Sequence, residues 1–237
     1  GMGPACQLLN IHRGDRMKTL VSMDTKAVNG PAYIKKQTGE EVKDFQNGDQ
    51  TSTLIRTENG KTMLIQHNVM TPQPYNRLYQ LTGSKGFANK YPVEGYALDA
   101  AQLTASGVQP KVDDLNSHGF LPQAEMEALI EKYQHPILKK YGEMAKEVGG
   151  HGGMDFIMDS RLVYCLQNGL PLDMDVYDLA EWCCLAELGA ISMDNGCAAV
   201  AFPDFTRGHW NDVKGFHHAF ATPEDEAAAE LAAETAT

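Results

Sequence analysis

The sequence lacks several features that would place it in a large functional class. Its 237 residues contain no run of about 18 apolar residues, so we expect no membrane-spanning helix. Acidic residues outnumber basic ones by 31 to 20, and the net charge of −11 argues against a nucleic-acid surface, which needs clustered lysine and arginine. The first residues show no signal peptide, but a signal could lie upstream, so the compartment stays unknown and export to a bacterial periplasm stays open.

Cysteine is scarce and lacks the spacing of a metal or redox site. There are five cysteines, and none forms a Cys-x-x-Cys pair. Cys183 and Cys184 are adjacent on a helical pattern, where their side chains point about 100° apart and cannot jointly hold a metal in the usual way. We therefore expect the cysteines to be small buried apolar residues and not to form a metal site. Seven of the eight histidines also lack metal-ligand spacing and are expected on the surface, while the eighth, His151, lies in a glycine-rich loop.

Local patterns predict strands followed by helices. The strongest signal is a hairpin, in which the segments 51–57 and 61–67 flank Asn59-Gly60, a pair that favours a type I′ turn. A third strand over 77–82 and a returning strand over 87–91 would extend this hairpin into an antiparallel meander. Residues 93–121 are predicted to be irregular. Helical patterns cover 31–49, 123–147 with a break at Pro136, 154–168 and 176–190, and a last strand is predicted over 198–202.

These elements predict an α+β fold. Its β-sheet would be open and mostly antiparallel, with helices packed on one face and the other face free for contact between copies of the chain. An apolar fraction of 43% and a charged fraction of 22% are typical of a globular chain of this size. We expect one sheet and substrate domain over residues 1–215 and a disordered acidic tail, rich in Ala and Glu, over residues 216–237.

The segment Gly149-Gly150-His151-Gly152-Gly153-Met154-Asp155 places four glycines around one histidine, directly before a helical pattern. Glycine is used where the backbone takes positive φ or approaches another group closely, so this turn is typical of a ligand site or a tight contact between domains. A dinucleotide-binding fingerprint is excluded because the glycine spacing is wrong and the loop follows a helix. His151 is then a general base, a hydrogen-bonding partner of a sugar or phosphate, or a simple loop histidine.

Two further loops combine aromatic and charged residues. In Thr71-Pro72-Gln73-Pro74-Tyr75-Asn76-Arg77, the two prolines hold the backbone extended and present Tyr75 and Arg77 from the rim of the sheet. The alternative is an aromatic side chain that packs on the sheet edge. The loop from Pro203 to Trp210 contains Asp204, Arg207 and Trp210, and its alternative interpretation is a structural anchor that closes the domain.

These motifs occur in a fixed order together with others: Arg13-Gly14-Asp15-Arg16, Gly60-Lys61-Thr62, Gly83-x-Lys85-Gly86 and Asp173-x-Asp175-Val176-Tyr177-Asp178. As a set, they resemble the NAD-dependent α-N-acetylgalactosaminidases of glycoside hydrolase family 109, relatives of the Gfo/Idh/MocA oxidoreductases. The resemblance runs from about residue 3 to about residue 210. It implies an enzyme that oxidises the sugar at C3, eliminates the aglycone, adds water and reduces the sugar again, with NAD bound mainly by an N-terminal Rossmann domain.

The resemblance also implies roles for single residues. Tyr75 matches a tyrosine that reaches the N-acetylgalactosamine, and His151 and Arg77 are expected beside it as substrate-binding residues. Contacts with the cofactor are expected from Gly150, Gly152, Arg207 and Trp210. The family's Tyr-Pro-Thr-His motif, which supplies catalytic acid and base groups, lies immediately before the segment that matches Gly1. We therefore assign no catalytic residue and expect this chain to be the C-terminal domain of a longer enzyme, inactive alone.

The expected partners are a glycan that ends in N-acetylgalactosamine, the Rossmann domain of the same protein, and further copies of the chain bound through the sheet. Two other functions remain open from the sequence. The longer protein could be a sugar oxidoreductase of the Gfo/Idh/MocA type, or the chain could be a non-catalytic module used for assembly or sugar binding.

Overall fold

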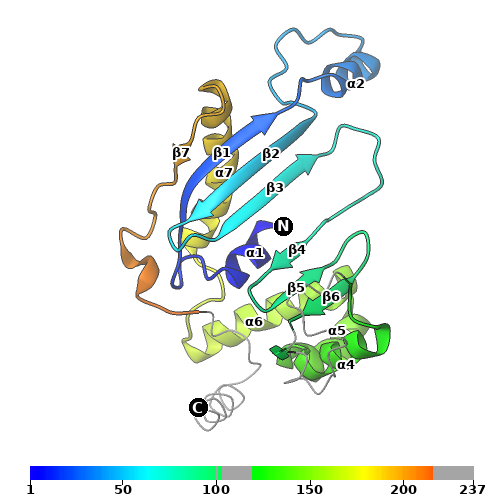
Figure 1. Cartoon of the computed structure of the whole chain (residues 1–237), viewed down its shortest axis with the longest axis vertical. Helices are drawn as coiled ribbons and strands as arrows, with labels where there is room; N and C mark the ends of the chain where they lie inside the picture. Colours follow the sequence, from blue (N-terminus) through cyan, green and yellow to red (C-terminus); the bar gives the residue numbers. More distant parts are fainter. Residues whose placement is uncertain (100, 103–118, 216–237) are drawn as a thin grey trace. The chain divides into compact units, whose positions relative to one another are not determined.

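In the computed structural model of the chain, residues 1–99, 101–102 and 119–215 are described (Figure 1). They divide into two units. Unit 1 comprises Gly1–Gln73 and the described part of Arg161–His218, and unit 2 comprises the described part of Pro74–Ser160. The expected acidic tail, residues 216–237, lies outside the described residues. The predicted α+β class is confirmed, because the described residues form six helices and two small, open antiparallel sheets.

Unit 1 contains a four-stranded sheet in the order β3-β2-β1-β7. Its elements are α1 (Met2–Leu8), β1 (Met17–Asp24), α2 (Asn29–Thr38), β2 (Gln50–Thr57), β3 (Thr62–Asn68), α7 (Val176–Asp194), β7 (Val200–Ala201) and η2 (His209–Asn211). The pairs β1–β2, β2–β3 and β1–β7 are all antiparallel. Helix α7 covers one face of the sheet, where it packs against β1 (Figure 1).

The core of unit 1 lies between this sheet and the helices α1 and α7. A buried row crosses the three long strands in register, from Leu20 to Ile55 to Met63. Cys6 from α1 and Leu188 from α7 pack against this row. Alternation along each strand sends these side chains to the covered face, so burial of one sheet face by α7 fixes the register of the hairpin.

The predicted hairpin is confirmed with its register, but its turn differs from the prediction. Only Gly60 has a positive φ, of 84°, whereas a type I′ turn needs positive φ at Asn59 as well. The Gly60 amide donates to the Thr57 carbonyl, and the Thr57 amide donates to the Lys61 carbonyl. This is a three-residue loop closed by a left-handed glycine, which places a bulge at the end of β2.

Helix α2 is shorter than the predicted 31–49 segment. It ends at Thr38 because Gly39 adopts a left-handed conformation with φ of 77°, and no helix follows before β2. Its N-terminus is capped by a residue that lies after the helix in the sequence, since the Asp49 carboxylate accepts hydrogen bonds from the amides of Val28 and Asn29. Burial acts to raise the pKa of Asp49, but these hydrogen bonds outweigh it and lower the pKa.

Helix α7 begins as predicted, at a capping box formed by Asp175 and Asp178. The Asp175 carboxylate accepts from the amides of Tyr177 and Asp178, while the Asp178 carboxylate accepts from the Asp175 amide. The helix extends beyond the predicted end at residue 190 and stops at Asp194.

Unit 2 contains a separate three-stranded antiparallel sheet in the order β4-β5-β6. Its elements are β4 (Gln80–Thr82), β5 (Gly86–Asn89), β6 (Gly95–Leu98), α4 (Gln123–Tyr133), α5 (Pro136–Val148), η1 (His151–Gly153) and the first part of α6 (Met154–Asn168). The prediction of one continuous meander is therefore wrong. The predicted pairing of the third strand with the returning strand is confirmed, as β4 with β5. The predicted junction with β3 is not formed, since β3 and β4 belong to different sheets and residues 69–79 form no strand, because Pro72 and Pro74 cannot donate to a ladder.

Sequence periodicity predicts the helices of this region better than its strands. The break at Pro136 separates α4 from α5, and α6 spans the predicted residues before Gly169. Strand β6 falls within the segment predicted to be irregular. None of the described helices has the length and hydropathy needed to cross a membrane.

Candidate functional site

The glycine-rich loop joins α5 to α6 and contains η1. All four glycines take positive φ: Gly149 at 91°, Gly150 at 75°, Gly152 at 71° and Gly153 at 96°. Gly153 is buried, and a Cβ added there would lie 2.6 Å from the carbonyl carbon of Ala145 in α5, so only glycine lets the loop close onto that helix. No atom lies within 4 Å of a Cβ added to Gly149 or Gly152, so both adjoin open space.

His151 stands in the middle of this loop with its side chain 76% exposed. It also takes a positive φ, of 48°, which is uncommon for a residue with a side chain. Its Nδ1 lies 2.8 Å from Oδ2 of Asp155 in the first turn of α6. This carboxylate was not among the predicted site residues. An Asp four residues after a histidine, at a helix start, is the pattern that could have indicated it.

Tyr75 and Arg77 lie in unit 2, on the extended segment before β4. Tyr75 is 73% exposed, so the alternative in which it packs on the sheet edge is wrong for this structure. The Arg77 guanidinium carbon lies 5.4 Å from the centre of the Tyr75 ring, a cation–π geometry. The pair presents a flat aromatic surface and a cation together.

Arg207 and Trp210 belong to unit 1, Arg207 in the turn between β7 and η2 and Trp210 within η2. Asp204 organises this turn, because its carboxylate accepts from the Thr206 hydroxyl and from the amides of Thr206 and Gly208. Burial acts to raise the pKa of Asp204, but the hydrogen bonds from Thr206 and Gly208 outweigh it and lower the pKa. Arg207 is exposed at φ 55°, and the Trp210 carbonyl accepts from the Gly14 amide.

The structure therefore places the predicted site residues in three local groups. Gly150, His151 and Gly152 share one loop, Tyr75 and Arg77 form one contact, and Arg207 and Trp210 lie in and just before η2, three residues apart. The first two groups belong to unit 2 and the third to unit 1.

A buried polar cluster in unit 1 was missed by the sequence analysis. His12 is buried, contrary to the predicted surface position, and its Nε2 lies 3.4 Å from Glu181 Oε2 and its Nδ1 3.9 Å from Asp178 Oδ1. Arg13 donates to both oxygens of Asp178 at 2.8 Å. Within the described part of the chain, both Glu181 oxygens and His12 Nδ1 lack hydrogen-bond partners. The available signal was the pair Asp178 and Glu181, three residues apart and followed by the apolar run from Trp182 to Ala186.

The remaining predictions on histidine and cysteine are met in part. His67, His135 and His209 are exposed as expected, whereas the other three histidines lie outside the described residues. Cys6 and Cys165 are buried, but Cys183 is exposed on α7. Burial raises the pKa of Cys6 to about 12 and that of Cys184 to about 11, so neither thiol is a nucleophile near neutral pH. Among the described residues, no group of His, Cys, Asp and Glu side chains is arranged to hold a metal ion.

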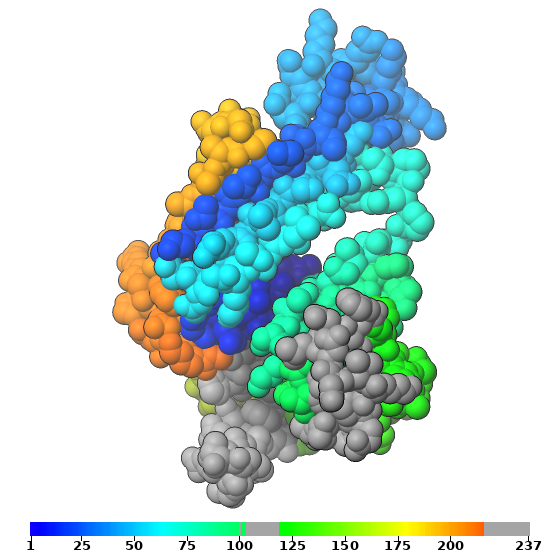
Figure 2. All heavy atoms as spheres, viewed as in Figure 1, coloured from blue at the N-terminus to red at the C-terminus, as the bar shows by residue number. Residues whose placement is uncertain are grey.

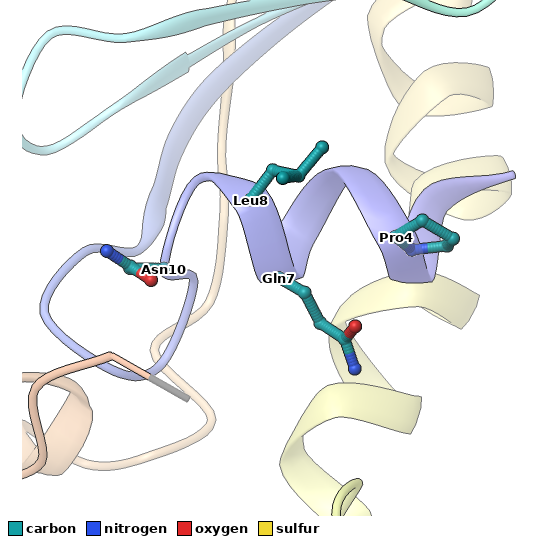
Figure 3. A pocket seen from close by; sticks show the side chains of 4 residues that line it. All are labelled: Pro4, Gln7, Leu8 and Asn10. Carbon is teal, nitrogen blue, oxygen red and sulfur yellow. The ribbon is translucent and has the colours of Figure 1, made fainter. Parts of the chain in front are cut away.

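A hollow of about 530 Å³ opens on the surface of unit 1 beside α1 (Figure 3). Pro4, Gln7 and Leu8 of the helix line it with Asn10 from the following loop. None of these four side chains is an acid or a base, so the hollow offers amide hydrogen bonds and apolar contact but no proton-transfer group.

Comparison with known proteins extends these local observations. Residues 1–212 match the family described as glycosyl hydrolase 109, C-terminal domain. The chain is 85% identical over 226 residues to glycosyl hydrolase family 109 protein 5 of Phocaeicola vulgatus, covering 95% of this chain and 44% of that protein. It is 70% identical over 221 residues to glycosyl hydrolase family 109 protein 1 of Bacteroides thetaiotaomicron, covering 93% of this chain and 47% of that protein.

A third relative, the glycosyl hydrolase family 109 protein of Porphyromonas gingivalis, is 69% identical over 221 residues, which cover 93% of this chain and 47% of that protein. The chain spans less than half the length of each of these relatives. The family match covers the glycine-rich loop, the Tyr75 segment and the Asp204 turn together. The chain therefore belongs to glycosyl hydrolase family 109, of which it represents the C-terminal domain.

Proposed function

We propose that the chain supplies the sugar-facing part of an NAD-dependent glycosidase that removes terminal α-linked N-acetylgalactosamine. The observation that carries this proposal is the exposure of Tyr75 on a segment that belongs to neither sheet. A tyrosine that is 73% exposed contributes little to packing, whereas its ring and hydroxyl suit a ligand with both apolar and polar faces. Family membership supports the proposal, because the relatives are named as glycosyl hydrolases.

The chemistry of the exposed groups in unit 2 supports a sugar as the ligand. A sugar ring presents C–H groups on its faces and hydroxyl groups at its edge. The Tyr75 ring offers an apolar surface, its hydroxyl both donates and accepts, and the Arg77 guanidinium donates in a fixed plane. His151 adds an exposed imidazole from a different loop of the same unit. These residues would bind and orient the sugar, while the catalytic acid and base groups would come from residues upstream of Gly1.

NAD fits the described residues only as a peripheral contact. The open backbone at Gly149 and Gly152 could approach a flat ring, and Arg207 is an exposed cation that suits a phosphate. The described strands form no parallel sheet with a glycine-rich turn, which a dinucleotide site needs. When bound, NAD would supply the hydride chemistry of the oxidation and reduction at the sugar, held mainly by an upstream Rossmann domain. We propose that residues 1–215 act together as the C-terminal domain beside it.

The test uses a longer family protein in which this chain follows the upstream residues. Incubation with an aryl α-N-acetylgalactosaminide should release the aryl group without added NAD. We expect Tyr75→Phe to lower kcat/KM by about 10-fold, since one hydrogen bond to the sugar is lost. Tyr33→Phe, at an exposed tyrosine of α2, is the matched control and should leave kcat/KM unchanged.

Other outcomes would redirect the proposal. An oxidised sugar without release of the aryl group would identify a sugar oxidoreductase. Sugar binding without any turnover would identify a non-catalytic module. Equal kinetics for Tyr75→Phe and the parent protein would remove Tyr75 from the site. The 237-residue chain alone should show no measurable release if the groups that transfer protons belong to the upstream residues, as we propose.

We also propose that copies of the chain associate through the outer face of the four-stranded sheet. Val21, Leu54 and Leu64 lie in register across β1, β2 and β3 on the face that α7 does not cover. Leu54 and Leu64 are both more than half exposed, and no other described element of unit 1 lies over these strands in Figure 2, where they appear in blue to cyan. Apolar rows of this kind are typical of interfaces. Sedimentation of the chain as a monomer at micromolar concentration would overturn this part of the proposal.

A further inference from the structure

The contact between His151 and Asp155 has features that packing does not explain. His151 is largely exposed, and its only partner among the described residues is the Asp155 carboxylate at 2.8 Å. Its left-handed backbone conformation costs free energy for a residue with a Cβ. An exposed and strained histidine gains little from burial, so its conformation serves another purpose than stability.

The glycines beside His151 make the contact with Asp155 possible. A Cβ added to Gly150 would lie 2.9 Å from both Cβ and Oδ2 of Asp155, so only glycine leaves room for the carboxylate. Backbone hydrogen bonds also hold Asp155 close to the loop, because the Gly150 carbonyl accepts from the amides of Gly153 and Asp155. On the other side of His151, a Cβ added to Gly152 would meet nothing within 4 Å. The loop therefore holds the carboxylate against one ring nitrogen and leaves space next to the histidine.

A carboxylate beside Nδ1 determines which nitrogen of a neutral imidazole carries the proton. An ionised carboxylate only accepts hydrogen bonds, so Nδ1 must be the donor, and Nε2 is then left as an acceptor. No hydrogen bond from the described residues occupies Nε2. An unprotonated, exposed Nε2 accepts a hydrogen bond from a hydroxyl group.

We propose that Asp155 is a positioning residue, which fixes the tautomer and orientation of His151 so that Nε2 accepts a hydrogen bond from a hydroxyl of the bound sugar. This inference rests on the proposed sugar-binding function and assigns a role to a residue outside the predicted site. The ligand class is a polyhydroxylated ring, because Nε2 needs a donor and the space beside Gly152 is not filled by protein.

The first experiment measures the tautomer directly in the ¹⁵N-labelled 237-residue chain. Long-range ¹H–¹⁵N correlations distinguish a protonated from an unprotonated ring nitrogen, and His151→Gln identifies the signals. We expect the Nδ1–H tautomer to predominate in the parent chain and to lose that predominance in Asp155→Asn, whose amide both donates and accepts. Asp159→Asn removes an equal charge one turn further along α6 and should leave the tautomer unchanged.

A second pair of variants tests the same contact from the glycine side. Gly150→Ala should displace the Asp155 carboxylate and change the tautomer as Asp155→Asn does. Gly152→Ala introduces a methyl group at a similar positive φ but into open space, so the tautomer should persist. If His151 keeps the Nδ1–H tautomer in Asp155→Asn, with the amide spectrum showing a folded chain, the positioning role is wrong.

The third experiment adds N-acetylgalactosamine to the labelled chain and follows the His151 ring signals. We expect Asp155→Asn to weaken binding by about 3- to 10-fold, the value of one hydrogen bond. Equal binding in the two chains would overturn the role of Asp155 in sugar recognition. If the parent chain does not respond to the sugar at all, the proposed sugar-binding function fails, while the tautomer result separately decides whether Asp155 orients His151.

Discussion

His12 and His151 are alike in local conformation and opposite in surroundings. Both take a left-handed backbone, with φ of 61° and 48°, and both face carboxylates. The His12 side chain is 4% exposed and lies between Asp178 and Glu181 of α7, whereas the His151 side chain is 76% exposed and has one carboxylate neighbour. Backbone strain in a histidine is thus compatible with a structural role in one unit and with ligand contact in the other.

The difference lies in what surrounds each histidine. Around His12, the segment 9–16 is held on several sides: Arg13 binds Asp178, Asp15 accepts from the Thr57 hydroxyl and the Asn59 amide, and the Gly14 amide donates to Trp210. Around His151, the loop contacts the end of α5, through Gly149 and Gly153, and the first turn of α6, through Asp155. Removing one member of a buried charged cluster is costly because the remaining charges stay out of contact with water. Removing one member of an exposed pair costs little because water solvates the remaining charge. Stability measurements should therefore separate the two histidines.

The largest effect is expected from Arg13→Ala. This change removes both hydrogen bonds to Asp178 and leaves a buried carboxylate beside Glu181 without that cation. Loss of one partner of a buried pair costs about 3–5 kcal/mol, so the free energy of unfolding of unit 1 should fall by this amount. Tryptophan fluorescence during urea unfolding measures it, because Trp182 and Trp210 both lie in unit 1.

Arg16→Ala is the control for this prediction. Arg16 pairs with Glu58 at 3.1 Å, but both side chains are about one quarter exposed. The free energy of unfolding should therefore fall by less than about 1 kcal/mol. Similar losses for the two variants would show that burial of the cluster does not distinguish it from a surface ion pair.

A smaller effect is expected in unit 2, from Gly153→Ala. The added Cβ would meet the Ala145 backbone at 2.6 Å and would also occupy a positive φ, so α5 and α6 must move apart. Overpacking and the left-handed conformation together should lower the free energy of unfolding of this region by about 2–4 kcal/mol. Hydrogen exchange of the amides in residues 136–168 should accelerate accordingly.

Gly152→Ala is the matched variant, with a positive φ but open space around its Cβ. It should lower the free energy of unfolding only by the cost of the left-handed conformation, about 1–2 kcal/mol. Equal exchange rates in the two variants would mean that the loop does not depend on its contact with α5.

The sequence predicts the helices α4, α5, α6 and α7 well because their signals are local. Asp175 caps α7 through amides two and three residues away, and Pro136 separates α4 from α5 by its missing amide hydrogen. The hairpin register follows from alternation in 51–57 and 61–67. The separation of β4 from β3 was not predictable in the same way, since whether two successive hairpins join into one sheet depends on contacts between distant residues.

The candidate site shows the same limit. The glycine spacing around His151 indicated a special loop, but the contact with Asp155 depends on how η1 enters α6. His12 was expected on the surface because a single histidine carries no signal of burial. Its partners Asp178 and Glu181 are more than 160 residues away in sequence, and only the packing of the segment 9–16 against α7 brings them together.

The last prediction compares the two histidines themselves, and His151→Ala should have the smallest effect. His12→Ala leaves the Glu181 carboxylate, which is 1% exposed, without the imidazole beside it, and should lower the free energy of unfolding of unit 1 by about 1–3 kcal/mol. His151→Ala removes an exposed ring whose partner stays in water, so the change should be within about 0.5 kcal/mol. Urea unfolding followed by tryptophan fluorescence measures the first, and far-UV circular dichroism follows both. A loss above 1 kcal/mol in His151→Ala would make His151 a structural residue like His12, and the reason to place it in a ligand site would then disappear.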